Sequence, residues 1–329
     1  MAKASIQEIK DLMKATGVGM MDCKKALEEA DGDTEKAVTI LREKGLATQA
    51  KKSGRAAAEG IVTSVVEGNI GAVNDIADEL GNQKLVNIIM LGAVVEVNIE
   101  TDFAANNEEF KAFVAAVAKT VIEKNPADVD ALKATIISGG DKTVEEALQD
   151  LFIKIRENMV IRRFQRFEGV LVPYIHDNGK IGVMVKLDTD LPADKVFEVG
   201  KNCALQVAAM NPAYLDRSAV PAEVLENEKT IVLAQMAEDP KMASKPEQVK
   251  AKIAEGKIGK YYTENCLVDQ AFVRSDIFDG TVGKYVEDAA KKLGGKITVA
   301  EFVRFERGEG VEKKADNFAE EVASMAGTK

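Results

Sequence analysis

Several residue types that build chemical sites are scarce in this chain. Its 329 residues include one histidine, three cysteines and no tryptophan, and aromatic residues make up 5% of the total. One histidine cannot supply a multi-histidine metal site. The cysteines, at positions 23, 203 and 266, form no CxxC pair. The sequence therefore excludes a zinc ribbon and a disulfide framework, and it indicates a reducing compartment.

Positive charge is also in short supply. The chain carries 44 Lys and Arg against 54 Asp and Glu, for a formal net charge of -10. Because nucleic acids are held by cations on phosphates and by aromatic stacking, this composition argues against direct nucleic-acid binding. The longest apolar run, near residues 88–95, is far shorter than the roughly 20 residues that cross a bilayer. The N-terminus has no apolar core of a secretory signal, so we predict a cytoplasmic protein with no membrane partner.

Catalytic motifs are missing as well. The sequence has no P-loop, no GxGxxG after a strand and no GxSxG elbow. His176 lies beside a predicted hairpin turn, and none of the cysteines is marked as its nucleophilic partner. We therefore expect no cofactor, no bound metal and no catalytic residue, and an enzyme built on His176 is a rival hypothesis.

The patterning predicts an α+β fold made of several parts. The apolar spacing of residues 1–46 indicates three short helices, the third ending near Gly45, with a capping box at Ser5 and Glu8. The expected parts after this bundle are a linker over 47–60, a core N-subdomain over 61–169, a core C-subdomain over 170–212 and 263–306, a helical hairpin over 213–262, and a C-terminal module over 307–329.

Within these parts the strands and helices follow from apolar periodicity and turn residues. Strands are expected at 61–66, 94–100, 170–175, 181–187 and 296–306, and helices at 107–124, 143–155, 193–210, 221–239, 246–262, 281–293 and 315–325. Residues 67–69 carry a hairpin signal, and 74–92 suit a short helix plus a strand. The sequence of residues 160–169 loosely resembles that of 302–310. Two subdomains of similar plan would explain this resemblance, and so would chance.

Several segments resemble the translation elongation factor Ts family. The first two signatures are GVGMMDCKKAL at 17–27 and ETDFA at 100–104. Further matches are NMVIRR at 158–163, YIH at 174–176 and RFERGEGVE at 304–312. The segments occur in the family's order along nearly the whole chain.

This resemblance implies a guanine-nucleotide exchange factor whose partner is the GTPase elongation factor Tu, in its GDP-bound and nucleotide-free forms. It implies that Thr101, Asp102, Phe103 and Ala104 displace the partner's Mg²⁺, with Phe103 as a wedge between helices. The further partner contacts that it implies are Met20, Met21, Lys24, Ile155, His176 and the final helix with Phe318, Val322 and Met325. The hairpin resembles the family's protruding coiled coil, which serves dimerisation or subunit contacts.

Local patterns leave other interpretations open. Phe103, Met20 and Met21 each suit a core position, His176 suits a solvent-facing turn, and the final helix equally suits a brace within the molecule. The N-terminal bundle resembles ubiquitin-associated (UBA) domains, so a protein-binding adaptor without exchange activity is the alternative function. The chain also departs from the family at Arg156, where glycine is frequent, and over 73–92, which is longer than in many relatives.

Overall fold

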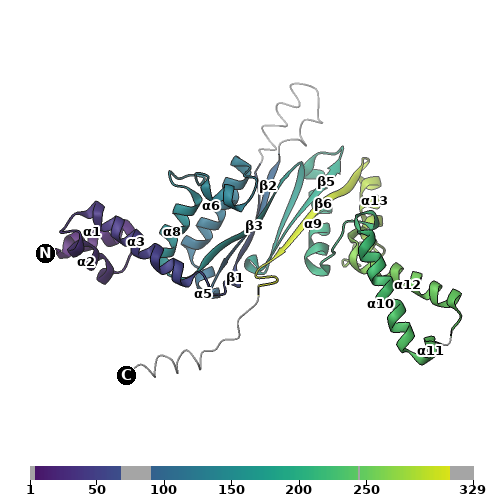
Figure 1. The fold of residues 1–329 in the computed structure, drawn as a ribbon. Helices are drawn as coiled ribbons and strands as arrows, with labels where there is room; N and C mark the ends of the chain where they lie inside the picture. The colour runs from purple at the N-terminus through teal and green to yellow at the C-terminus, as the bar shows by residue number, and fades with distance from the viewer. Residues whose placement is uncertain (1–3, 68–89, 244, 312–329) are drawn as a thin grey trace.

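Two three-stranded antiparallel sheets lie at the centre of the molecule, with helices on their outer faces (Figure 1). A helical bundle at the N-terminal end and a helical hairpin at the opposite end project from this centre. The computed structural model describes residues 4–67, 90–243 and 245–311. The predicted α+β fold is confirmed.

The N-terminal bundle consists of α1 (Ile6–Thr16), α2 (Met20–Glu29) and α3 (Thr34–Lys52). The predicted capping box starts α1, since the Ser5 hydroxyl accepts from the Glu8 amide and the Glu8 carboxylate accepts from the Ser5 amide. The third helix does not end near Gly45 as predicted. It continues to Lys52 because residues 46–52 contain good helix formers and no proline, so the first half of the expected linker is helical.

The first sheet has the order β1 (Glu59–Glu67), β2 (Leu91–Ile99) and β3 (Met159–Glu168). Its outer face is covered by α6 (Glu108–Lys124) and α8 (Val144–Ile155), with α7 (Val129–Ala134) between them. The middle strand β2 is buried on both faces, because alternate residues Val95, Val97 and Ile99 face these helices while Val94 faces the second sheet.

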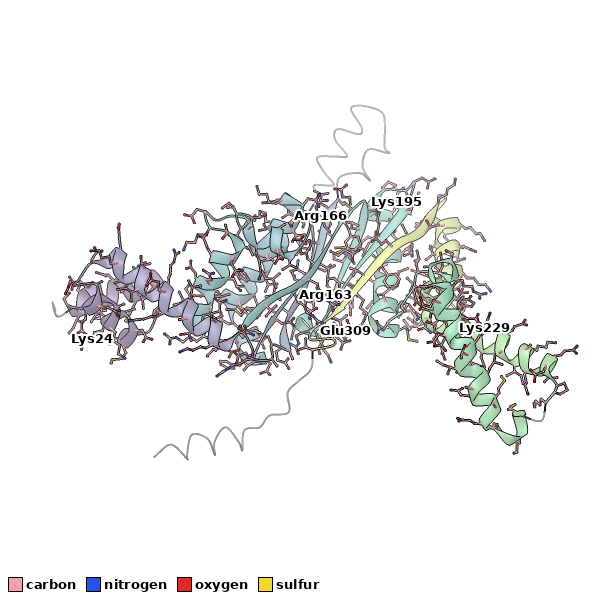
Figure 2. All side chains as sticks on the ribbon, viewed as in Figure 1. Lys24, Arg163, Arg166, Lys195, Lys229 and Glu309 are labelled. Atoms are coloured by element: carbon pink, nitrogen blue, oxygen red, sulfur yellow. The ribbon has the colours of Figure 1, made fainter. Side chains whose placement is uncertain are left out.

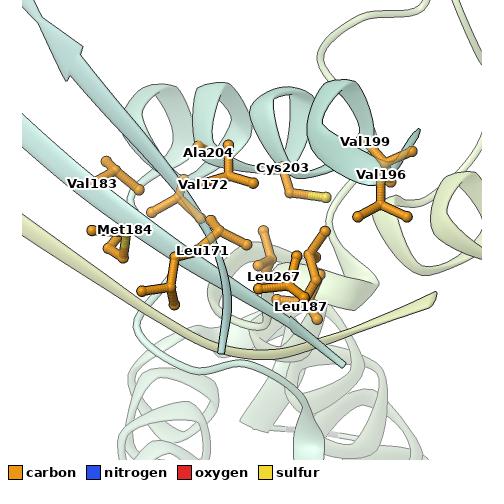
Figure 3. Close-up of a cluster of buried hydrophobic side chains, with 14 of the residues drawn as sticks. Leu171, Val172, Val183, Met184, Leu187, Val196, Val199, Cys203, Ala204 and Leu267 are labelled. Carbon is orange, nitrogen blue, oxygen red and sulfur yellow. The ribbon is translucent and has the colours of Figure 1, made fainter. Parts of the chain in front are cut away.

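The second sheet has the order β4 (Val170–His176), β5 (Ile181–Thr189) and β6 (Ile297–Glu306). Helices α9 (Ala193–Met210) and α13 (Val282–Leu293) pack against it. Figure 3 shows α9 over the strands, with Cys203 and Ala204 directed toward Val172 and Leu187. The predicted limits of α9 are confirmed, and the β4–β5 turn takes positive φ at Asn178 and Gly179, as this Asn-Gly pair predicts.

The projecting hairpin contains α10 (Ala222–Glu238), the single turn α11 (Pro240–Ala243) and α12 (Glu247–Asn265). A small apolar cluster of Val232, Met236 and Ala254 joins the two long helices. The helices are therefore where the sequence predicts them, and they pack mainly on each other, away from both sheets (Figure 1).

A buried carboxylate lies where the two sheets meet. Glu96 on β2 has no exposed surface, and its oxygens accept from Arg162 Nη1 at 3.0 Å, Arg163 Nε at 2.6 Å and the amide of Gly308 at 2.9 Å. Arg163 also pairs with Glu309 at 3.1 Å, and Figure 2 shows these two residues next to each other toward the lower end of the sheets. This network fastens the segment after β6 to the first sheet.

The strand β3 was not predicted, because its arginines hide the apolar alternation of its other residues. It occupies the same place in its sheet as β6 does in the second, but 160–169 covers nearly all of β3 whereas 302–310 covers the second half of β6 and the turn after it. Three predictions lie wholly or mostly outside the described residues: the 67–69 hairpin signal, the helix and strand over 74–92, and the helix over 315–325. Of the range 74–92 only residues 90–92 are described, and Leu91 and Gly92 begin β2.

Candidate functional site

The second signature segment forms the one-turn helix α5 (Asp102–Ala105), directly after β2. Thr101 caps this helix, because its hydroxyl accepts from the Ala104 amide at 3.2 Å. Ala104 and Ala105 are buried in the core of the first sheet. The base of the helix is thus anchored, and its capping residue lies at the surface.

Phe103 projects from this anchored helix into solvent. The side chain is 89% exposed, and Asp102 beside it is also exposed. An isolated exposed leucine or valine is ordinary, but an aromatic ring left fully in water forgoes a large burial energy. The core or staple interpretation of Phe103 is therefore wrong for this chain, and its exposure suits a ring that contacts another molecule.

Met20, Met21 and Lys24 lie on the outer face of α2. The two methionines are 53% and 63% exposed, whereas Cys23 and Leu27 of the same helix are fully buried. Lys24 forms a surface ion pair with Glu28 at 3.8 Å. The core interpretation of these methionines is also wrong, and exposed methionines are adaptable contact residues.

His176 ends β4 at the turn into β5, and it is exposed. Its Nδ1 lies 3.0 Å from the hydroxyl of Tyr174, while all three cysteines are buried elsewhere. This neighbour is a phenol rather than a nucleophilic serine or cysteine, so the geometry gives the enzyme hypothesis no support.

A shallow hollow of about 360 Å³ joins the two halves of the candidate surface. Asn106, just after α5, and Lys111 on α6 line one side, and Ile175 and Asn178, around the His176 turn, line the other. The structure therefore brings the Phe103 segment and the His176 turn to one surface. Met20, Met21 and Lys24 belong to the separate bundle at the N-terminal end (Figure 2).

The described part of the chain contains neither a metal-ligand cluster nor a membrane-spanning helix. Among those residues, no group of three or more His, Cys, Asp or Glu side chains is arranged to hold a metal ion. No helix within them is long and apolar enough to span a bilayer.

Comparison with known proteins decides the family. Residues 100–309 match the family described as Elongation factor TS. A protein of Clostridium perfringens strain SM101 named Elongation factor Ts is 46% identical over 322 residues, covering 97% of this chain and 98% of the relative. The same name is carried by a Clostridium tetani protein, 46% identical over 95% of this chain and 96% of its own length, and by a Syntrophotalea carbinolica protein, 45% identical over 98% and 99%.

The chain belongs to the elongation factor Ts family. It is thus a relative of translation elongation factors along almost its full length. The matched family region begins at Glu100, immediately before the Thr101–Ala104 segment, and it includes His176.

In this elongation factor Ts chain, sequence reasoning missed the residue that holds the short helix α5 in place. The Glu157 carboxylate accepts from the Thr101 amide at 3.0 Å and from the Thr101 hydroxyl at 2.8 Å. Glu157 lies two positions after the predicted contact Ile155, which is half-buried against the first core. No signal in the sequence pairs positions 56 residues apart, so only the fold reveals this contact.

Proposed function

We propose that the protein is a guanine-nucleotide exchange factor for elongation factor Tu, which promotes GDP release in translation elongation. The observation that supports this best is the 89% exposed ring of Phe103 on a helix whose base is buried. Transfer of such a ring into a partner contributes about 1.5–3 kcal/mol. Membership of the elongation factor Ts family supports the class of partner.

In this proposal the mechanism is thermodynamic linkage, and it requires no acid, base or metal from this chain. The factor prefers the nucleotide-free partner to the GDP-bound one, so GDP affinity falls by the same coupling free energy. Phe103 enters between helices of the partner, flanked by Thr101, Asp102 and Ala104. Its entry displaces the partner's Mg²⁺ and distorts the nucleotide site.

The proposal assigns additional contacts to Met20, Met21, Lys24, Ile155 and His176. Coupling free energies of about 1–3 kcal/mol change an affinity about 5–150-fold. A wedge assisted by contacts on the bundle and on the β4–β5 turn reaches the upper part of that range more readily than a single ring does. The exposure of Met20 and Met21 supports a partner contact on the bundle in addition to the one at Phe103.

We place this activity in the cytoplasm, on a protein partner rather than on nucleic acid or a membrane. The net charge of -10 supports this choice, because RNA backbones repel an acidic surface. The hairpin of α10 and α12, which exposes Ile231 and Leu233, is the predicted surface for a homodimer.

Release of a fluorescent GDP analogue from purified elongation factor Tu tests the function. Substoichiometric amounts of this protein are expected to accelerate release with multiple turnovers. Binding without acceleration would instead support the alternative, a UBA-like adaptor without exchange activity. His176→Ala distinguishes an exchange factor from an enzyme. An exchange factor keeps most of its activity without this one contact, whereas an enzyme built on His176 loses its activity.

A further inference from the structure

Three consecutive residues between α8 and β3 each bond to a different part of the protein. Arg156, Glu157 and Asn158, which we call the α8–β3 junction, contact the N-terminal bundle, the wedge helix α5 and the segment that links them. Each contact joins residues more than 50 positions apart in the chain, so the junction closes long loops in one place.

Arg156 ties the junction to the bundle. It ends α8 in the left-handed region, with φ 64°, where glycine is favoured and a side chain is strained. This explains the frequent glycine at the corresponding family position and shows that arginine can occupy it here. The guanidinium pairs with Asp22 on α2 at 2.5 Å, and the Arg156 carbonyl accepts from Lys52 at the end of α3.

Glu157 and Asn158 tie the junction to the wedge. Glu157 holds both the amide and the hydroxyl of Thr101, the residue that caps α5. Asn158 is buried; its amide donates to the Glu100 carboxylate at 2.6 Å, and its side chain donates to the Arg55 carbonyl at 2.9 Å. The residues before the wedge and after α3 are therefore fixed to the same point.

Other contacts also join the bundle to α8, since Ile153 packs against the bundle core and the Lys154 side chain lies close to Gly17. Ile153 packs on Gly45, and Arg42 pairs with Asp150 at 3.3 Å. A cleft of about 300 Å³ remains between the bundle and α8, with Asp22 and Arg156 among its lining residues. Because packing leaves this gap, the polar contacts of the junction contribute to holding the bundle at its angle.

We infer that the α8–β3 junction sets the angle between the bundle and the wedge helix, which makes Arg156 and Glu157 positioning residues for nucleotide exchange. The inference rests on the proposed function, in which both Met20 and Phe103 contact one partner. Two contacts held in a fixed arrangement dock without the ordering cost that two loosely tethered ones incur.

A charge-swap cycle at Asp22 and Arg156 tests the bundle half of the junction in the free protein. Spin labels at Glu35→Cys on α3 and Asp130→Cys on α7 report the distance between bundle and core. Selective labelling is feasible because the native cysteines are buried, and burial raises the pKa of the Cys203 thiol to about 12. Asp22→Arg and Arg156→Asp each broaden the distance distribution, and the double swap narrows it again. Unchanged distributions in the single variants, or no recovery in the double swap, would overturn the inference.

The rate of GDP release from elongation factor Tu gives the second readout for the bundle half of the junction. Since an exposed ion pair contributes up to about 1 kcal/mol, Arg156→Asp is expected to raise the half-saturating concentration about two- to fivefold, with little change in the maximal rate. Lys133→Ala is the matched control, because it breaks an ion pair of α8 with α7, Lys133–Glu145 at 3.5 Å, outside the junction. Equal effects of the control and Arg156→Asp would contradict a positioning role.

Hydrogen exchange at the Ala104 amide tests the wedge half. Glu157→Ala is expected to speed this exchange at least fivefold and to lower the maximal rate of GDP release, while Glu157→Gln, which keeps an acceptor for Thr101, loses less of both. Ala104 protection that is unchanged in Glu157→Ala would refute the wedge half. These measurements on the free protein remain informative if the wild type fails to accelerate GDP release, an outcome that refutes the exchange function itself.

Discussion

Two phenylalanines seven positions apart have opposite environments. Phe103 on α5 is 89% exposed, whereas Phe110 on α6 has no exposed surface and lies among the helices that cover the first sheet. Both helices begin at a side-chain cap, Thr101 for α5 and Asn107 for α6. The two helices therefore start in the same way, and the two phenylalanines differ only in what their rings contact.

This contrast separates residues that stabilise the fold from residues available to a partner. Phe110 contributes burial energy to the chain itself, and Phe103 contributes almost none. A fold under selection for stability alone has no reason to hold an aromatic ring in water on an anchored helix. The predictions below test whether stability and exchange divide between the two rings in this way.

The largest stability effect is expected at Phe110. Phe110→Ala leaves a cavity under α6 and is expected to lower the free energy of unfolding by about 3–5 kcal/mol. Urea unfolding monitored by circular dichroism measures this change. Nucleotide exchange per folded molecule should stay near the wild-type value, and a selective loss of exchange would break the proposed division.

A smaller loss is expected at Glu96, the buried carboxylate at the meeting of the sheets. Removing one member of a fully buried ion pair costs about 3–5 kcal/mol. Arg162 and Arg163 keep 27% and 32% of their side-chain surface exposed, so water partly compensates and about 2–3 kcal/mol is expected for Glu96→Ala. Urea unfolding of this variant beside Arg166→Ala, whose carboxylate partner Glu168 is exposed, checks it; equal losses would show that the Glu96 network has no special weight.

Removal of the cap of α5 is expected to have a local effect. Thr101→Ala removes the hydroxyl that accepts from Ala104, at a cost of about 1 kcal/mol. We expect faster hydrogen exchange of the α5 amides with little change in global unfolding. Thr101→Ser, which keeps the hydroxyl, should behave like the wild type, and identical exchange in the alanine variant would show that α5 is held without its cap.

The helices were the most predictable part of the fold. Their limits follow from capping residues and turn formers close in the sequence, as at the Thr143–Glu146 capping box that starts α8 and at the Asn211 residue that ends α9. The exposure of Phe103 could not be predicted from its local pattern, which favours a core residue. The family resemblance alone pointed to the surface.

Two missed features, strand β3 and the role of Glu157, depend on contacts distant in sequence. Strand β3 went unrecognised because Arg162 and Arg163 make sense within a strand only once Glu96 is known to face them. The role of Glu157 depends on Thr101, 56 positions earlier. Such pairs are set by the tertiary fold, and a single sequence carries no periodic signal for them.

The most direct test of the central claim is GDP release from elongation factor Tu with Phe103→Ala, measured beside its thermal unfolding. Phe103→Leu is the matched variant, because it keeps an apolar side chain. Loss of the ring's burial, about 1.5–3 kcal/mol, corresponds to an exchange rate reduced at least tenfold in the alanine variant, with an unchanged melting temperature and an intermediate rate for leucine. Wild-type exchange by Phe103→Ala would contradict the account.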